Sequence, residues 1–353
     1  MTKTSIFVTG ATGYIGGSVL TRLLAHPNAS SFEITALVRT QEKAKLLEEF
    51  GVKTLLGSHS DIDKLEEVAS KSNVVFAMAN ADDLGAAKAI LSGFKKRYET
   101  TGEIPILLHT SGTGVLSDRA DGLYATETVY SDLNISQIES LAPTQPHRDV
   151  DLVVVEAGRQ GYVRTHIILP STIYGLATGP LFDKGISNRH SVQVPALIKA
   201  SWDRSQGGMV GEGKNLWPDV EIHEVADLYM ILFDRATSDP TTPNGREGFY
   251  FGESGEYLMY DVCKAIAKAL VEVGRGKSEE PTTFTQEDLN KYFGGSAYLG
   301  SNSRCRAERS RSIGWKPVKT TKDMILSIKP EIDELIRSGR ISEKALPGRD
   351  QYY

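Results

Sequence analysis

Three glycines near the start of the chain have a spacing that can hold a phosphate group. The sequence Thr9-Gly10-Ala11-Thr12-Gly13-Tyr14-Ile15-Gly16 lies between a short apolar run and a helical pattern. In such a turn the first glycine permits a tight bend, the second lets the backbone approach a pyrophosphate, and the third lets the helix pack on the strand. The helix N-terminus then offers unpaired N–H groups to the phosphates. We therefore expect a dinucleotide to bind at Thr9, Gly10, Thr12, Gly13, Tyr14, Ile15 and Gly16.

The end of the second predicted strand indicates which dinucleotide binds. A carboxylate at this place would bind the ribose 2′-OH of NAD. This chain instead has Arg39 there, followed by Lys43 one turn into the next helical pattern, and the first acidic residue is Glu42. A guanidinium fork suits a 2′-phosphate. The sequence therefore predicts NADP(H), with a solvated surface arginine as the alternative.

The elements that position this turn alternate between strand and helix over the first 112 residues. Because strands that alternate with helices of this length favour right-handed βαβ crossovers, we predict a parallel sheet. The predicted strands are Ser5–Thr9, Glu33–Val38, Val52–Leu56, Asn73–Ala79 and Ile104–His109, and the predicted helices are Tyr14–Leu24, Gln41–Phe50, Asp61–Ser70 and Asp83–Tyr98.

The regular alternation of predicted strands and helices ends after the first 112 residues. A polar stretch over 113–146 precedes a predicted helix near 147–159 and a sixth strand, 163–169. Residues 175–221 are rich in Gly and Pro, which suits loops. A helix over 224–236 and a strand over 248–252 return to the sheet, and the chain from Met259 onward is mostly helical.

We therefore predict an α/β fold, a doubly wound parallel Rossmann sheet with a smaller, mostly helical C-terminal substrate lobe. The Rossmann domain would span 1–174, with 222–252 returning to it, and the lobe would comprise 175–221 and 253–353.

Composition narrows the classes of partner. The 353 residues carry a formal charge of -5 and contain two cysteines. An acidic balance disfavours nucleic acid, and so few cysteines make a disulfide framework improbable. No apolar run approaches the ~20 residues that span a bilayer, and the first strand pattern leaves no room for a signal peptide. We expect a cytoplasmic protein with a small-molecule substrate and no membrane partner, and a homodimer stays open.

Several motifs together resemble the extended and atypical short-chain dehydrogenases/reductases. The glycine turn is similar to their cofactor motif, and Leu169-Pro170-Ser171-Thr172-Ile173-Tyr174-Gly175 resembles their sixth strand and following loop. The segments at 210–213, 220–228 and 312–317 resemble their substrate-lobe hinge and C-terminal element. The resemblance implies an NAD(P)-binding epimerase, dehydratase or reductase fold whose substrate lies between sheet and lobe. It also implies cofactor contacts at Asn80 and Pro170.

The catalytic pattern of that superfamily is only partly present. Its first element is a Ser or Thr after the fifth strand, which Thr110-Ser111-Gly112-Thr113 supplies. Its second is Tyr-x-x-x-Lys, in which an ammonium lowers the tyrosine pKa. No lysine occurs between Lys96 and Lys184. An ungapped count back from Pro170 places His147 where that lysine would be.

Other side chains are therefore candidates for the chemistry. We expect Ser111 or Thr113 to hydrogen-bond the substrate, because strand C-terminal ends face the cleft. Tyr124, Tyr130 and His147 are candidate proton donors, although each also suits packing or helix capping. We expect Tyr174 and Trp217 to line the substrate pocket, with core packing as the alternative. No Cys/His set has metal-ligand spacing, so no metal is predicted.

These features favour an NADPH-dependent oxidoreductase that reduces a small carbonyl or conjugated carbonyl compound. One alternative is epimerase or dehydratase chemistry on a nucleotide-sugar-like substrate. The other is an NADP(H)-binding regulator without turnover, which the missing Tyr-Lys pair favours. A tyrosine without an adjacent ammonium should donate a proton well and accept one poorly.

Overall fold

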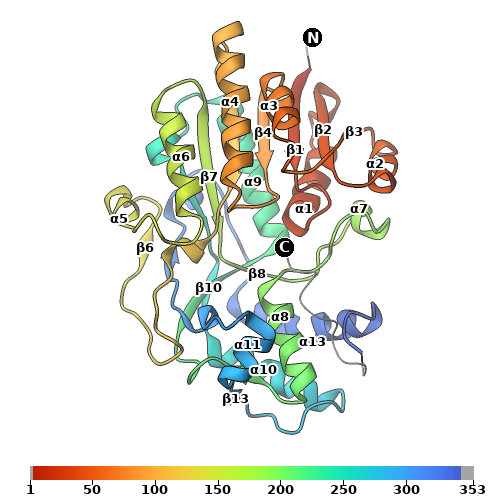
Figure 1. Ribbon diagram of the computed structural model, residues 1–353, viewed down its shortest axis with the longest axis vertical. Coiled ribbons are helices and arrows are strands. Elements are labelled where there is room, and N and C mark those ends of the chain that lie inside the picture. The colour runs from red at the N-terminus through yellow and green to blue at the C-terminus, as the bar shows by residue number, and fades with distance from the viewer. Residues whose placement is uncertain (1–2, 343–353) are drawn as a thin grey trace.

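The main layer of the protein is a seven-stranded parallel sheet (Figure 1). The computed structural model describes residues 3–342. The strand order is β11-β7-β5-β4-β1-β2-β3, so the order reverses between β1 and β4, where doubly wound folds bind ligands. The strands are β1 (Thr4–Thr9), β2 (Phe32–Val38), β3 (Lys53–Leu56), β4 (Val74–Ala77), β5 (Ile106–Thr110), β7 (Arg164–Pro170) and β11 (Phe249–Gly252).

Helices cover both faces of this sheet, which explains why its central strands are apolar throughout. Every residue of β5 is buried, as expected for a parallel strand between two helical layers. Thr110 contacts Tyr229 on one face, and the next residue, Ser111, contacts Asp151 on the other. The covering helices are α1 (Tyr14–Leu24), α2 (Gln41–Glu48), α3 (Ile62–Ser70), α4 (Leu84–Thr101), α6 (Arg148–Arg159) and α9 (Ile222–Ser238).

A smaller part lies beyond the C-terminal ends of the strands, in the lower half of Figure 1. It has its own hydrophobic cluster, which includes Ile198, Val262 and Ile332. A three-stranded sheet, β12-β10-β8, is covered there by α8, α10 and α13. The elements are β8 (Thr172–Tyr174), β9 (Gly208–Met209), β10 (Leu216–Glu221), β12 (Gly255–Leu258), β13 (Thr282–Thr283), α7 (Pro180–Asp183), α8 (Gln193–Arg204), α10 (Met259–Glu272), α11 (Gln286–Phe293), α12 (Glu308–Ser312) and α13 (Thr321–Arg337).

Two short segments join the sheet to this smaller part. The chain after β5 forms a 3₁₀ turn, η2 (Thr113–Leu116), then β6 (Tyr130–Ser131) and α5 (Ile135–Glu139). The second segment contains η4 (Tyr298–Gly300) and β14 (Cys305–Arg306), which pairs with β6. Ser303 Oγ donates to the Thr113 carbonyl oxygen at 2.7 Å, across 190 residues of sequence.

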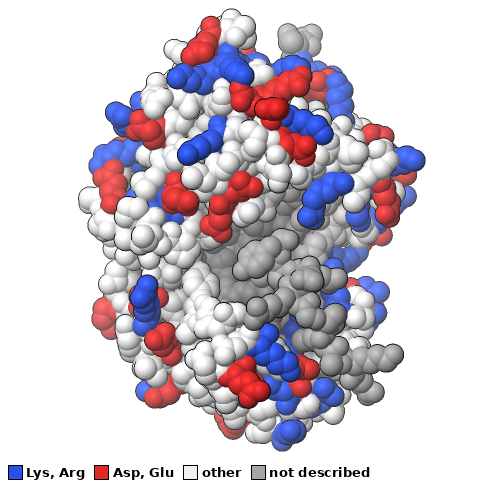
Figure 2. Space-filling view, viewed as in Figure 1, with Lys and Arg blue, Asp and Glu red and all other residues white. Residues whose placement is uncertain are grey.

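The predicted α/β fold with a doubly wound parallel sheet is confirmed. Residues 175–221 differ from the expected loops, because they contain the twelve-residue helix α8 and the strand β10. Prolines and glycines flank these elements or stand at their edges, which hides the periodicity between them. Within residues 3–342, no helix is long and apolar enough to cross a bilayer. Acidic and basic side chains alternate over the face in Figure 2, without a large patch of one sign.

Candidate active site at the C-terminal edge of the sheet

The glycine turn between β1 and α1 needs glycine at two positions for the fold itself. Gly10 has φ +76°, and a Cβ there would lie 2.6 Å from the Met78 carbonyl oxygen. A Cβ on Gly16 would collide with the Gly10 carbonyl oxygen. Gly13 differs, because its φ is -84° and its nearest neighbour for a Cβ is the Gly10 oxygen at 3.1 Å. A side chain at Gly13 would therefore need the Gly10 carbonyl to shift by only a few tenths of an ångström, much less than one at Gly10 or Gly16.

The N-terminus of α1 is open to an anion. Gly13 caps the helix without a side-chain hydrogen bond, and its own N–H donates to the Gly10 carbonyl oxygen at 2.8 Å. The N–H groups of Tyr14, Ile15 and Gly16 have no acceptor within an α-helix. These donors and the positive end of the helix dipole suit a pyrophosphate. The turn therefore fits the phosphates of a dinucleotide.

Arg39 and Lys43, the two cations predicted to bind the cofactor, differ in their hydrogen bonds. Arg39 is exposed at the end of β2 and has no ion pair or hydrogen bond within residues 3–342. Lys43 Nζ donates to the Gly185 carbonyl oxygen, on the loop after β8. That loop also covers the turn, because Ser187 Oγ donates to the Ala11 carbonyl oxygen at 3.0 Å. Arg39 is thus the unengaged cation, whereas Lys43 holds a wall of the site.

Most other expected cofactor contacts have structural partners. The Thr9 hydroxyl accepts from the Met78 N–H at 3.1 Å, and the Tyr14 hydroxyl donates to the Gly175 carbonyl oxygen. Thr12 accepts the Asn188 N–H at its carbonyl oxygen, and Ile15 packs against the core. Asn80 is exposed and its Oδ1 accepts from the Asp82 N–H at 3.1 Å, whereas Pro170 is buried at the end of β7.

Ser111 and Thr113 lie where the sequence places them, at the end of β5, but both are buried. Ser111 Oγ donates to Asp151 Oδ2 at 3.0 Å, so this hydroxyl faces α6. Burial raises the pKa of Asp151 to about 7, although the Ser111 hydrogen bond and the nearby Arg148 charge lower it. Thr113 Oγ1 is buried and has no hydrogen-bond partner in the described part of the chain.

His147 lies at the first turn of α6, facing the loop after β4. Its Nδ1 is 2.6 Å from Asp82 Oδ1. Its backbone has φ 65°, which is costly for a residue with a side chain. A Cβ on Gly112 or Gly114 would lie 3.2 or 3.3 Å from His147 Nε2, so these glycines leave room for the imidazole.

Tyr298 brings a hydroxyl to the same place from the smaller part of the protein. A Cβ on Gly114 would collide with this hydroxyl, so Tyr298 Oη and His147 Nε2 both lie over Gly114. Burial of the hydroxyl and the nearby Asp82 charge raise the pKa of Tyr298. Tyr298 as a whole residue is 39% exposed, and it forms one wall of a pocket.

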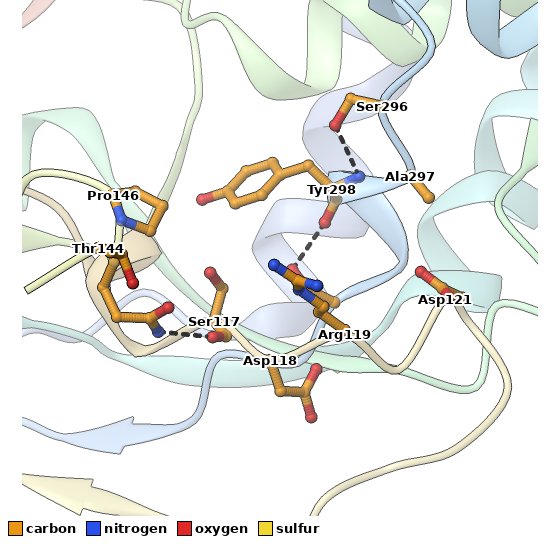
Figure 3. Close-up of a pocket in the computed structure, with 11 residues that line it drawn as sticks. Ser117, Asp118, Arg119, Asp121, Thr144, Pro146, Ser296, Ala297 and Tyr298 are labelled. Atoms are coloured by element: carbon orange, nitrogen blue, oxygen red, sulfur yellow. Dashed lines mark hydrogen bonds between the residues drawn. The ribbon is translucent and has the colours of Figure 1, made fainter. Parts of the chain in front are cut away.

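That pocket has a volume of about 480 Å³ and a mostly polar lining. Figure 3 shows the Tyr298 ring extending across it from η4, with its hydroxyl end toward Pro146. The loop after η2 supplies Asp118 and Arg119 to the opposite wall. A pocket of this size suits a small molecule.

Comparison with known proteins finds a family match in the N-terminal part of the chain and relatives over nearly its whole length. Residues 2–96 match the NmrA-like family. The chain is 26% identical to "Oxidase ucsJ" from an Acremonium species over 362 residues, covering 95% of this chain and 99% of that protein. It is also 26% identical over 323 residues to an uncharacterized protein of Schizosaccharomyces pombe, covering 90% and 96% of the two chains.

Solved structures share the fold across the whole chain. The PbgP3 protein of Burkholderia pseudomallei matches with a TM-score of 0.67 at 14% identity, covering 96% of this chain and 98% of that one. A dTDP-glucose 4,6-dehydratase of Bacillus anthracis, solved with NAD, matches with a TM-score of 0.63 at 14% identity over 94% and 97%. The chain therefore has the fold of these enzymes over nearly its whole length, and its first 96 residues match the NmrA-like family.

Four aromatic residues were predicted to act in catalysis or to line the substrate pocket, and the structure places them on a loop, in a short strand and in the core of the smaller part. Tyr124 is 52% exposed on the long loop, and Tyr130 lies in β6, paired with β14. Tyr174 and Trp217, expected on the pocket wall, are core residues of the smaller part. Their polar atoms donate to the carbonyl oxygens of Thr320 and Ser301, because a buried donor needs an acceptor.

Sequence reasoning missed Tyr298 altogether. It lies in the turn-rich interruption at 294–317, where no motif or periodicity distinguishes it. The only clue in the sequence is negative, since the chain between Lys96 and Lys184 lacks a Tyr-Lys pair. Trp217 does have a role near the site, because its ring packs edge-to-face on Tyr298 with centroids 5.5 Å apart.

Proposed function

We propose that this protein is an NADP(H)-dependent oxidoreductase that reduces the carbonyl group of a small molecule. The observation that carries the proposal is the open N-terminus of α1 beside an unengaged Arg39 at the end of β2. The α1 N–H groups would hold the pyrophosphate, and Arg39 would bind the 2′-phosphate of NADP(H). When bound, the nicotinamide supplies a hydride. One relative is named an oxidase and several structural neighbours were solved in complex with NAD, which supports redox chemistry.

The substrate would occupy the pocket between η2 and η4. Its polar lining and its volume of about 480 Å³ suit a small polar molecule. The chain supplies no lysine between 97 and 183 to make a tyrosine basic, which favours reduction over oxidation of an alcohol.

Nucleotide-sugar epimerase or dehydratase chemistry, found in several structural neighbours, is less well supported for this chain. A diphosphate-linked sugar needs cations that are free to bind the diphosphate. All five Lys and Arg side chains of 175–221 have partners: Lys184, Arg189, Lys199, Arg204 and Lys214.

Titration calorimetry with NADPH and NADH tests the cofactor assignment. We expect NADPH to bind at least tenfold more tightly, a difference of about 1.4 kcal/mol, because NADH lacks the phosphate that Arg39 would bind. Arg39→Ala should abolish this preference. Lys45→Ala is the matched control, because Lys45 is an exposed cation on α2 without a partner within residues 3–342.

Turnover is tested by NADPH oxidation with 4-nitrobenzaldehyde, methylglyoxal and 9,10-phenanthrenequinone. Equal affinities for the two cofactors, or an unchanged preference in Arg39→Ala, would contradict the NADP(H) assignment. Tight NADPH binding without turnover of any of these carbonyl compounds would instead favour a cofactor-binding regulator.

A further inference from the structure

A hydroxyl group from the far end of the chain lies beside the turn that follows β5. α6 carries no tyrosine, since its sequence is RDVDLVVVEAGR. Tyr298 places its hydroxyl over Gly114, in the turn that directly follows β5. We infer that Tyr298 is the catalytic acid of the proposed reductase. This inference rests on the proposed function.

The protein holds Tyr298 in place through the residues that follow it. Asn302 donates from its backbone N–H and its side chain to the two carboxylate oxygens of Asp118, at 2.7 and 2.9 Å. The Gly122 N–H donates to the Gly300 carbonyl oxygen at 2.7 Å. Segment 298–303 is thus bonded directly to the loop that follows β5 and η2, which fixes the backbone that carries Tyr298.

The smaller part supports Tyr298 from the other side. Asn215 Nδ2 donates to the carbonyl oxygens of Leu299 and Ser301 at 3.0 and 2.7 Å. The Trp217 ring packs edge-to-face on the Tyr298 ring. A side chain held on both sides in this way is preorganised, as a group that acts on a substrate must be.

Two glycines create the space that the hydroxyl occupies. A methyl group on Gly114 would collide with Tyr298 Oη, and one on Gly112 would approach His147 Nε2 at 3.2 Å. Both glycines follow β5, and the turn they belong to is buried. The hydroxyl therefore lies beside the C-terminal end of the sheet, on a side chain that lines the pocket and points across it toward Pro146 (Figure 3).

Burial of the hydroxyl and the nearby charge of Asp82 favour its protonated form. Asp82 approaches from the loop after β4, paired with His147 at the start of α6, and the buried His109 lies behind them in β5. Asp118, Arg119 and Asp121 line the pocket on the other side of the ring. No lysine of residues 97–183 is available to stabilise a phenolate. A phenol in this setting donates a proton rather than accepts one.

In the step that we assign to Tyr298, the substrate oxygen receives the phenolic proton. The carbonyl carbon gains a hydride from the reduced cofactor, which is thereby oxidised, and the carbon–oxygen π bond breaks. The oxygen takes the proton from Tyr298 Oη, so that the product is an alcohol. The phenolate that remains regains its proton from water.

Three variants test this assignment with carbonyl-dependent NADPH oxidation. Tyr298→Phe keeps the ring on Trp217 and removes only the hydroxyl, so kcat/KM should fall roughly 10²- to 10⁴-fold. Gly114→Ala keeps the hydroxyl but displaces it, and should lower kcat/KM at least tenfold. Tyr124→Phe, on the exposed loop, is the matched control and should stay within twofold. The NADPH Kd of each variant should match the wild type, and so should the thermal midpoints of Tyr298→Phe and Tyr124→Phe.

A second measurement does not depend on turnover. In protein labelled with [ζ-¹³C]tyrosine, the Tyr298 resonance is assigned by its loss in Tyr298→Phe. Addition of NADP⁺ with 4-nitrobenzaldehyde should shift this resonance and leave that of Tyr124 in place. An unshifted Tyr298 resonance, or more than half of the wild-type kcat/KM in Tyr298→Phe, overturns the assignment. A larger loss in His147→Ala than in Tyr298→Phe also overturns it.

The two proposals fail in different ways. If the wild-type protein neither binds NADPH nor oxidises it, the proposed function fails, whatever the Tyr298 resonance does. If the wild type is active and Tyr298→Phe is equally active, only the assignment of Tyr298 fails.

Discussion

The Asp151→Asn variant should remove a pH dependence of stability that one buried carboxyl group creates. Asp151 is fully buried, and only one of its oxygens, Oδ2, has a hydrogen-bond partner among the described residues. Burial raises the pKa of Asp151 from 3.8 to about 7, and the hydrogen bond from Ser111 and the charge of Arg148 offset this effect only in part.

The sign of the effect follows from where the proton is held more tightly. Between pH 4 and pH 7 the folded protein retains a proton on Asp151 that the unfolded chain has lost, so stability falls as the pH rises. The rise in pKa from 3.8 to about 7 corresponds to a total penalty of about 4 kcal/mol above pH 7. About 2–3 kcal/mol of it should develop between pH 5 and pH 8.

Urea unfolding at pH 5, 6, 7 and 8 measures this penalty. The free energy of unfolding of Asp151→Asn, minus that of the wild type, should increase by about 2–3 kcal/mol over this range. The side-chain amide in Asp151→Asn also places an N–H group where Oδ1 of Asp151 has no partner. This costs about 1–3 kcal/mol of stability at every pH, so it does not alter the dependence of the free-energy difference on pH.

His109 and His166 are buried too, and burial lowers their pKa values to about 4 and about 3. They destabilise the fold as the pH falls below 6.5, but they do so in both proteins and cancel in the difference. Asp63→Asn, an exposed acid on α3, is the control and should give a flat difference. If the difference for Asp151→Asn is equally flat, the carboxyl ionises without a penalty and the burial argument is wrong.

Three other substitutions test the roles of single side chains. Gly13→Val should abolish NADPH binding and leave the far-UV circular dichroism spectrum unchanged, and retained micromolar binding would place the dinucleotide elsewhere. Gly16→Ala should lower the free energy of unfolding by about 1–3 kcal/mol, because its Cβ meets the Gly10 carbonyl. Trp217→Phe should lower the free energy of unfolding by about 1–2 kcal/mol, because the hydrogen bond to Ser301 is lost, and it should also lower turnover. If the variant turns over substrate as fast as the wild type, the ring does not position Tyr298. Tyr174→Phe should lower the free energy of unfolding in urea by about 1 kcal/mol and leave turnover unchanged. Impaired turnover would indicate that Tyr174 lines the substrate pocket.

The sequence alone was sufficient for the features that depend on local spacing. The alternation of short apolar runs with helical patterns predicts the parallel sheet, because each strand and helix carries its own periodicity. The turn from Gly10 to Gly16 is local in its spacing and in one steric requirement, since a Cβ on Gly16 would meet the Gly10 carbonyl oxygen, whereas the obstacle at Gly10 is the distant Met78 carbonyl oxygen. The absence of lysine between Lys96 and Lys184 was also visible, and it ruled out the superfamily's usual pair.

Only the tertiary structure decided which side chains meet at the end of β5. Tyr298 reaches Gly114 because bonds between segments 190 residues apart, such as Ser303 to Thr113, bring η4 onto η2. Such contacts leave no periodic trace in the sequence, and a tyrosine in a turn-rich stretch resembles any other. The sequence also could not show whether Tyr174 and Trp217 are buried, because both residue types occur in pocket walls and in cores. Their burial in the smaller part depends on helices and strands that meet only after folding.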